Sequence, residues 1–163
     1  MAALANDAQV SQLGSSAVKI TLPCVKADTF YSGAVVWLDV SGDTGQVQVD
    51  SIAAGDRIAG ICAKQQTTTA AADEVEIYVG GIWEMPCAAG VTATDVGYWL
   101  VHDIGATQTD NPADLVASVD ASNGLEANDA CMGLILGLPS TARVIVNCGV
   151  LQGSIYSATL GWV

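Results

Sequence analysis

The feature that most constrains the fold is the stretch at residues 72–86, which reads ADEVEIYVGGIWEMP. Residues 75–79 alternate β-branched and polar side chains, and a period of two places the β-branched ones on one face of a strand. Gly80 and Gly81 then interrupt the run, because residues without a Cβ accept backbone angles that Val and Ile avoid. The apolar pattern resumes and ends at Pro86, which lacks a ladder donor. We therefore expect a hairpin-like unit here, with the rest of the chain packed around it.

Similar runs predict strands along most of the chain. The nearly continuous apolar run at residues 34–40 predicts a buried strand, and the strictly alternating run at 46–50 predicts its hairpin partner. The 17 glycines and a charged fraction of only 13% fit short strands joined by tight turns. We therefore predict an all-β fold, a small antiparallel β-barrel or sandwich. The other expected strands are residues 17–25, 57–64, 96–103, 114–119, 131–138 and 142–148.

The strand patterns of the two halves of the chain match in order. Trp37-Leu38 parallels Trp99-Leu100, at an offset of roughly sixty residues that grows to about seventy-five further along, as loop lengths differ. This order favours an internal duplication, although any strand-rich sequence yields some matches of this kind. The other matched segments are 46–50 with 115–120, 58–61 with 132–135, and 75–80 with 144–149.

The two ends of the chain differ from its middle. Residues 1–16 are rich in Ala, Asn, Gln and Ser with scattered apolar residues, which is typical of a flexible arm that a partner could order. We expect residues 17–149 to form the β-barrel domain and residues 150–163 an apolar C-terminal tail. No signal peptide is expected, since the start lacks a basic segment followed by an apolar one. No apolar run reaches the roughly 18 residues that span a bilayer.

The net charge of −12 restricts the partners of the protein. Five basic residues against seventeen acidic ones argue against binding to nucleic acid, which requires Lys and Arg at the phosphates, and against binding to an anionic membrane. The five cysteines form no CxxC pair, so they indicate neither a zinc site nor a redox motif. We interpret them as buried thiols of a protein made in a reducing cytoplasm, with one disulfide as the alternative.

No arrangement of residues indicates catalysis, a cofactor or a metal. The single histidine, His102, has Asp103 beside it, but consecutive strand residues point to opposite faces, so we expect a structural or surface role. The densest acidic cluster, at residues 73–76 together with Glu84, is interpreted as a charged face that discourages edge pairing. The spacing of Asp39, Asp43 and Asp50 does not fit a calcium loop. We therefore expect a protein that is not an enzyme.

The aromatic residues are more informative about contacts. Trp37 and Trp99 lie in apolar runs and are expected in the core. Trp83 follows the glycine pair and Trp162 ends the tail, and such aromatic anchors are favoured at subunit interfaces, with packing inside the chain as the alternative. The candidate interface residues are Leu13, Trp83, Met85, Tyr156 and Trp162.

The order of the strand motifs is distinctive. GDRIAGIC is followed by a Thr/Ala-rich loop, by ADEVEIYVGGIWEMP, by DVGYWLVHD, and then by ACMGLILG and ARVIVNC. This series resembles the small decoration, or cement, proteins of tailed-phage capsids. The motifs that carry the resemblance are residues 55–60, 75–79, 81–86 and 97–100, and the likeness extends over residues 18–149. The chain departs from that pattern in the loop at 104–113, the extra cysteines and the Trp-bearing tail.

The resemblance implies a small β-barrel, often a homotrimer, that binds the major capsid protein on the outer surface of the head. Such a protein is made in the cytoplasm of the bacterial host and staples neighbouring coat subunits in the virion. It needs no chemistry and no cofactor. The alternatives are a head fibre or a receptor- or glycan-binding virion protein, and then a small enzyme that uses the acidic residues.

Overall fold

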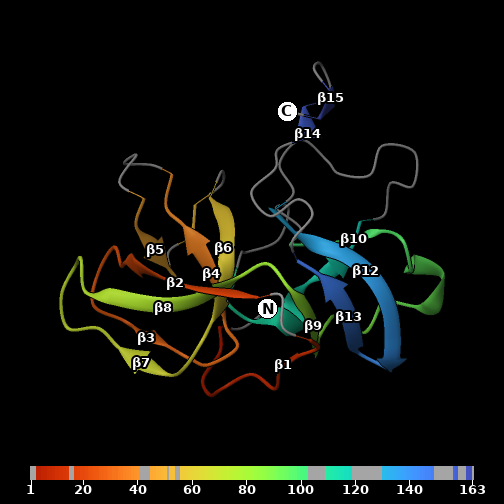
Figure 1. The fold of residues 1–163 in the computed structure, drawn as a ribbon, viewed down its shortest axis with the longest axis horizontal. Helices are drawn as coiled ribbons and strands as arrows, with labels where there is room; N and C mark the ends of the chain where they lie inside the picture. Colours follow the sequence, from red (N-terminus) through yellow and green to blue (C-terminus); the bar gives the residue numbers. More distant parts are fainter. Residues whose placement is uncertain are drawn as a thin grey trace.

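The computed structural model describes residues 3–14, 17–40, 45–50, 52–53, 56–102, 109–118 and 130–148, and the backbone of 156–157 and 161–162. This part of the chain is all-β, with two antiparallel main sheets and no α-helix (Figure 1). The first sheet has the strand order β2 (Val18–Pro23), β8 (Glu74–Val79), β6 (Arg57–Cys62), β4 (Val35–Leu38) and β5 (Val47–Gln48). The second has the order β1 (Ser11–Gln12), β9 (Ile82–Pro86), β13 (Arg143–Asn147), β12 (Ala130–Ser140), β10 (Trp99–His102) and β11 (Val116–Ala117).

Short elements complete the fold. They are the pairs β3 (Thr29–Phe30) with β7 (Gln66–Thr67) and β14 (Tyr156–Ser157) with β15 (Gly161–Trp162), and the 3-10 turns η1 (Ala93–Asp95) and η2 (Pro112–Asp114). None of the helices in the described ranges has the length and apolar character that a bilayer crossing requires.

The two main sheets repeat one topology. Leaving β1 aside, the order β2-β8-β6-β4-β5 in the first sheet is matched strand for strand by β9-β13-β12-β10-β11 in the second. The register also repeats, since Ile20 pairs with Ile77 and Trp83 pairs with Val146 in equivalent ladders. Pro23 and Pro86 consequently end equivalent strands. This arrangement agrees with the internal duplication that the sequence favours.

The hydrogen bonds beside the central strands are repeated as well. Gly33 N–H donates to Cys62 O at 2.9 Å and Cys62 N–H to Ala34 O at 2.9 Å. In the second sheet Gly97 N–H donates to Ile135 O at 2.9 Å, and Ile135 N–H donates to Tyr98 O at 2.9 Å. Gly33 and Gly97 have φ of 80° and 92°, a conformation that side chains with a Cβ rarely adopt. Each half therefore needs a glycine at the same place.

A second pair of glycines lets the strands approach closely. A Cβ built on Gly60 would lie 2.2 Å from the carbonyl oxygen of Tyr78, and one built on Gly133 would lie 2.3 Å from that of Asn147. Gly60 pairs with Val36 and Gly133 with Leu100, each next to a β-bulge in its ladder. A bulge increases the local twist and bends the strand, so these positions determine how strongly each sheet curls.

Curling brings the first strand of each half near its last. Val25 N–H donates to Val47 O at 2.9 Å, and Ala88 N–H donates to Leu115 O at 2.8 Å. Cys24 also forms an isolated parallel bridge with Val47. None of these contacts extends into a ladder, so neither sheet closes into a barrel. Of the two architectures expected from the sequence, the open, sandwich-like one is found.

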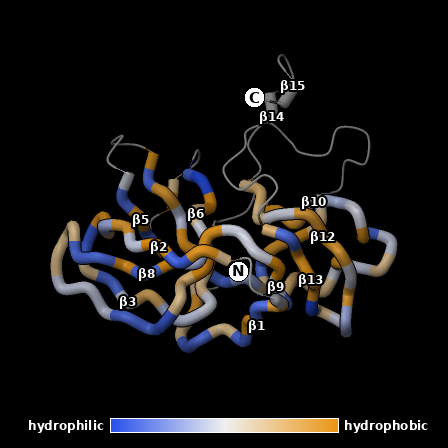
Figure 2. The backbone as a smooth tube through the Cα atoms, viewed as in Figure 1, coloured by the Kyte–Doolittle hydropathy of each residue, from blue (hydrophilic) through white to orange (hydrophobic). Residues whose placement is uncertain are grey.

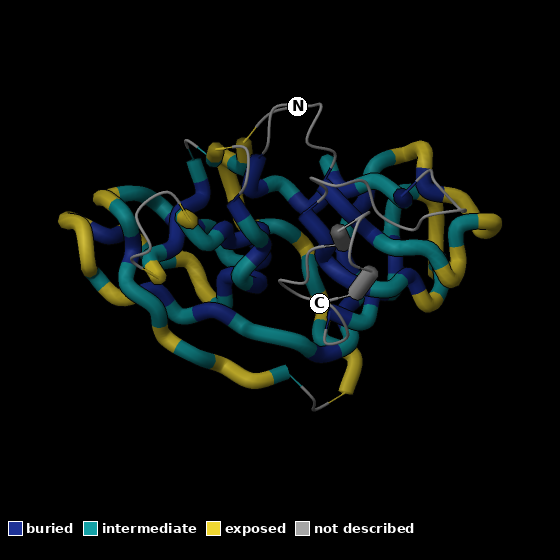
Figure 3. Tube along the Cα trace, turned by 90° about the horizontal axis from the view of Figure 1, so that it is seen from above, coloured by how far each residue is buried: buried dark blue, intermediate teal, exposed yellow. Residues whose placement is uncertain are grey.

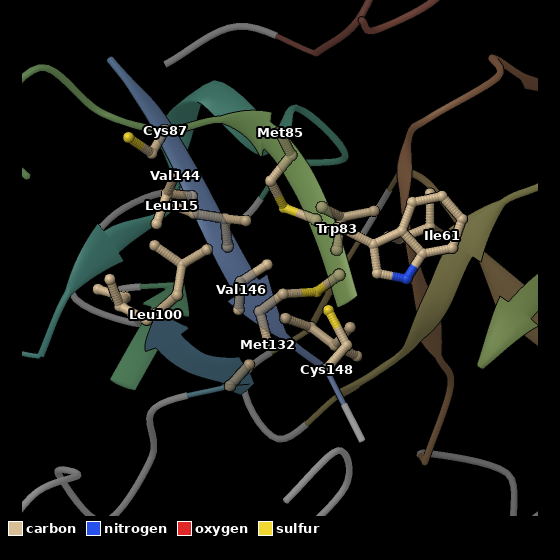
Figure 4. Close-up of a cluster of buried hydrophobic side chains, with 14 of the residues drawn as sticks. Ile61, Trp83, Met85, Cys87, Leu100, Leu115, Met132, Val144, Val146 and Cys148 are labelled. Carbon is tan, nitrogen blue, oxygen red and sulfur yellow. The ribbon is translucent and has the colours of Figure 1, made fainter. Parts of the chain in front are cut away.

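The core has two main parts. One lies within the first half and contains Phe30, Val36 and Ile77, all fully buried. The other joins the halves, because Trp37 and Ile61 of the first sheet pack with residues of the second, such as Trp83. Figure 4 shows Ile61 and Trp83 in this cluster. Hydrophobic residues recur along the strands of both sheets, and much of the exposed tube lies in peripheral loops (Figures 2 and 3). The expected burial of Trp37 is confirmed, whereas Trp99 is only partly buried.

The expected hairpin at residues 72–86 is wrong in one respect. β8 and β9 are both strands, but they do not pair and belong to different sheets. Gly80 and Gly81, with φ of 71° and 88°, turn the chain from one sheet into the other. A period-two pattern with a glycine break fits a hairpin and also two consecutive strands in different sheets, so periodicity alone does not distinguish these two arrangements.

The N-terminal segment also differs from the free arm expected at residues 1–16. Within it, β1 pairs with β9 through Ser11 opposite Glu84 and Gln12 opposite Trp83. Leu4 N–H donates to Asp110 Oδ1 at 2.8 Å, and its side chain packs on the core of the first half. Residues 3–14 are therefore part of the folded body. Most of the expected tail at 150–163 lies outside the described residues.

Candidate interaction surface

Two of the expected interface residues are buried in the core. The indole of Trp83 is 3% exposed, donates to Gly80 O at 2.8 Å and lies 5.2 Å from the Tyr78 ring, centroid to centroid. Met85 is fully buried. Both side chains point from β9 into the core that joins the two halves (Figure 4). Both residues therefore pack inside the chain and not at the subunit interface expected from the sequence, and internal packing is the stated alternative for Trp83.

Leu13 does lie on the surface, with 37% of its area exposed. Its N–H donates to Ile82 O at 2.8 Å, which holds it at the start of β9. Tyr156 and Trp162 pair with each other in the β14–β15 ladder, but their side chains are outside the described part of the structure. Of the candidate interface residues, Leu13 is thus the one that the structure places at an accessible position.

A second exposed apolar residue is Val18, on the strand that enters the first sheet. Val18 is 58% exposed and pairs with Val79 at the start of β2. Ala17 packs against Gly81, where an added Cβ would lie 2.8 Å from the Ala17 Cβ. We call this area the junction surface; it consists of Leu13, Ala17, Val18, Val79 and Ile82, and it lies where the chain passes between the sheets. The sequence pattern gives no sign that Val18 is exposed, because alternation does not show which strand is at an edge.

A cationic group lies on the opposite face of β2 from Val18, because Val18 and Lys19 are consecutive residues of the strand. Lys19 Nζ lies 2.8 Å from Glu76 Oε2, and Lys64 Nζ pairs with Glu76 Oε1. The hydrogen bonds from the two ammonium groups lower the pKa of Glu76 to about 2. The hydrogen bond to Glu76 likewise raises the pKa of Lys19. Two cations on one carboxylate leave a local positive charge in a chain whose net charge is −12.

The acidic cluster predicted from the sequence therefore has a different role. β8 lies between β2 and β6 and is not an edge strand, so Glu76 does not protect an edge. Glu84 instead accepts a hydrogen bond from Arg143 Nε at 2.7 Å, and Arg143 also donates to Gln9 O at 3.1 Å. Asp73 accepts hydrogen bonds from two backbone N–H groups, those of Thr69 at 2.7 Å and Ala70 at 3.1 Å, which lower its pKa. These carboxylates hold strands and turns together.

His102 is fully buried where the two halves meet. Its Nε2 accepts a hydrogen bond from Thr109 N–H at 3.2 Å, and its ring lies edge-on to Trp37 with centroids 5.3 Å apart. Trp37 Nε1 donates to Thr109 O at 3.0 Å, and Thr109 Oγ1 donates to Asp114 Oδ2 at 2.6 Å. This network connects the halves through Thr109, which agrees with the structural role expected of His102.

Asp28 and Asp50 form a separate carboxyl pair in the first half. Asp28 Oδ2 and Asp50 Oδ1 are buried without a hydrogen-bond partner, while Asp50 Oδ2 accepts from Lys26 Nζ at 2.8 Å. Burial, followed by the interaction with Asp50, raises the pKa of Asp28. No group of three or more metal-ligating side chains occurs among the described residues. All five cysteines are buried and free, as the sequence analysis expected.

Comparisons of the chain with models of protein families, with curated proteins and with solved structures found no match.

Proposed function

We propose that this protein is a non-enzymatic cement protein, which binds the outer surface of a tailed-phage head and staples neighbouring major capsid subunits. The observation that carries the proposal is the order of the motifs resembling that family. Each of them falls on a strand or its flanking turn: β6, β8, the Gly81 turn with β9, and the Gly97 turn with β10. The likeness therefore involves the elements that build both sheets.

The physical properties of the chain are compatible with this role. A body with a core that joins two curled sheets presents a fixed surface, and the junction surface offers exposed apolar side chains. A modest affinity at each site is sufficient, because contacts repeated over a lattice raise the total binding strength. The excess negative charge keeps free copies soluble before they assemble.

Binding to heads tests the proposal. Purified protein is mixed with expanded heads of the phage that encodes it, prepared without this gene, and sedimented. We expect saturable cosedimentation and heads that resist higher temperature or lower salt than undecorated heads. Wild-type protein that stays in the supernatant at all concentrations, with heads of unchanged stability, would refute the proposal.

Matched variants test whether the junction surface makes the contact. Leu13→Asp places a charge on that surface, whereas Leu136→Asp places one on β12 at a residue that is similarly exposed, 43% against 37%. We expect Leu13→Asp to weaken cosedimentation at least tenfold and Leu136→Asp to leave it unchanged, with equal thermal transitions for both. Equal binding by the two variants would move the contact elsewhere without refuting head binding.

A further inference from the structure

The repeated topology reveals an edge that is covered in one half and open in the other. β9 is the first strand of the second half, and its outer edge is covered by β1. The equivalent strand in the first half is β2, which pairs with β8 on one side. On the other side β5 reaches only the end of the strand, where Cys24 bridges Val47, and no described strand pairs with residues 18–22. A strand edge with free N–H and C=O groups is a template for pairing with another chain.

The β1–β9 ladder shows which groups of β2 point outward. Leu13 N–H donates to Ile82 O, and Ser11 pairs with Glu84, so Ile82 and Glu84 direct their backbone polar groups toward β1. The equivalent residues of β2 are Lys19 and Thr21, given that Ile20 corresponds to Trp83. Lys19 and Thr21 therefore present backbone hydrogen-bonding groups at the open edge.

We propose that this edge pairs with the β2 edge of a second copy of the chain, antiparallel and about a two-fold axis at Ile20, which gives a dimer instead of the homotrimer that the resemblance implies. The axis makes the two strands antiparallel, as β1 is to β9. Lys19 then pairs with Thr21 of the partner subunit, which satisfies the outward groups of both. On one face, Val18 lies opposite Leu22 of the partner subunit, so an exposed apolar residue is covered.

Charge and strand composition favour a second copy over a foreign strand. Val18–Pro23 contains no carboxylate, so two copies of a chain with a net charge of −12 meet here without acidic groups in the paired strands. Lys19 and Pro23 are residues that commonly protect edges. Neither residue blocks this pairing, because Pro23 lies beyond the paired residues in this register and the ammonium of Lys19 is held by Glu76 at 2.8 Å.

Sedimentation equilibrium of the full chain tests the pairing without any head. We expect a concentration-dependent mass that approaches twice the 16.6 kDa of one chain. Thr21→Pro removes one outward N–H and is expected to weaken dimerisation at least tenfold, because proline is tolerated at an edge but cannot donate there. Thr21→Ala keeps the N–H and should dimerise as the wild type does. A wild-type monomer or trimer at all concentrations overturns the proposal.

A cysteine pair provides a readout that does not depend on affinity. Ile20 faces its own counterpart across the axis in a non-hydrogen-bonded pair, where Cβ atoms are about 4.5–5.5 Å apart. Ile20→Cys is therefore expected to form a covalent dimer on mild oxidation, while the five native thiols stay buried. Thr21→Cys faces Lys19 of the partner subunit and should not cross-link. Equal cross-linking of both variants, or of neither, overturns the register. Head binding is measured separately, so failure here leaves the proposed function standing.

Discussion

Replacing Gly60 with alanine should strain the first sheet. The added Cβ would lie 2.2 Å from Tyr78 O, whereas ordinary van der Waals contact begins at 3.4 Å. Tyr78 O is a backbone atom of the neighbouring strand β8, so relief requires the two strands to move apart by about 1 Å, against the native close packing. Overpacking of this kind costs about 1–3 kcal/mol. For a chain of this size, that corresponds to a fall in Tm of roughly 2–12 °C.

The duplication makes this prediction more specific. Gly133→Ala brings a Cβ to 2.3 Å from Asn147 O and 2.8 Å from Cys148 Cα in the second sheet, at a backbone φ of 159°, so its cost should be at least that of Gly60→Ala. Gly137→Ala in β12 is the matched control, because no atom lies within 4 Å of its added Cβ, and it should change stability by less than about 0.5 kcal/mol. Urea unfolding followed by Trp fluorescence measures all three. A Gly60→Ala protein as stable as the control would refute the close-approach argument, and a Gly133→Ala protein as stable as the control would refute the equivalence of the halves.

Three further predictions concern charges and thiols. Lys19 and Lys64 lower the pKa of Glu76 from 4.5 to about 2, so the contribution of ionised Glu76 to stability is present above pH 4.5 and is lost as the pH falls through about 2. An NMR titration of the Glu76 carboxyl with a midpoint near 4.5 would contradict this prediction. Burial raises the pKa of Asp28 above its ordinary 3.8, so the ionised form destabilises the fold at neutral pH. Asp28→Asn should therefore raise Tm at pH 7, and this gain should disappear below pH 3.8, where the carboxyl is protonated. An unchanged Tm at pH 7 would count against the buried carboxyl pair. The five cysteines should react with a thiol reagent only in denaturant, so native-state labelling at a rate typical of exposed thiols would contradict their burial.

The sequence predicted the longer strands because their patterns are local. The alternation at residues 75–79 and the apolar run at 34–40 became β8 and β4. Two-residue strands such as β1 and β3 were missed, since Ser11–Gln12 and Thr29–Phe30 carry no periodicity and form only through distant partners. The repeated motif order also anticipated the repeated sheet order, because duplicated local patterns fold into duplicated ladders.

The surface was harder to predict than the strands. Periodicity shows that Trp83 and Met85 share an apolar face of a strand, but it does not show that a second sheet covers that face. Val18 presents the opposite case, since its strand reads as half-buried while its position at the open end of an edge strand leaves it 58% exposed. Which strands occupy edges depends on the order across the sheet, and no local pattern encodes that order.

Electron cryomicroscopy of heads reconstituted with the purified protein tests the central claim most directly. The account predicts ordered density on the outer surface of the head, at symmetry-related positions that bridge neighbouring coat subunits, into which the two curled sheets fit with Leu13 toward the coat. Heads without added density, or density confined to a tail or fibre attachment point, would contradict it.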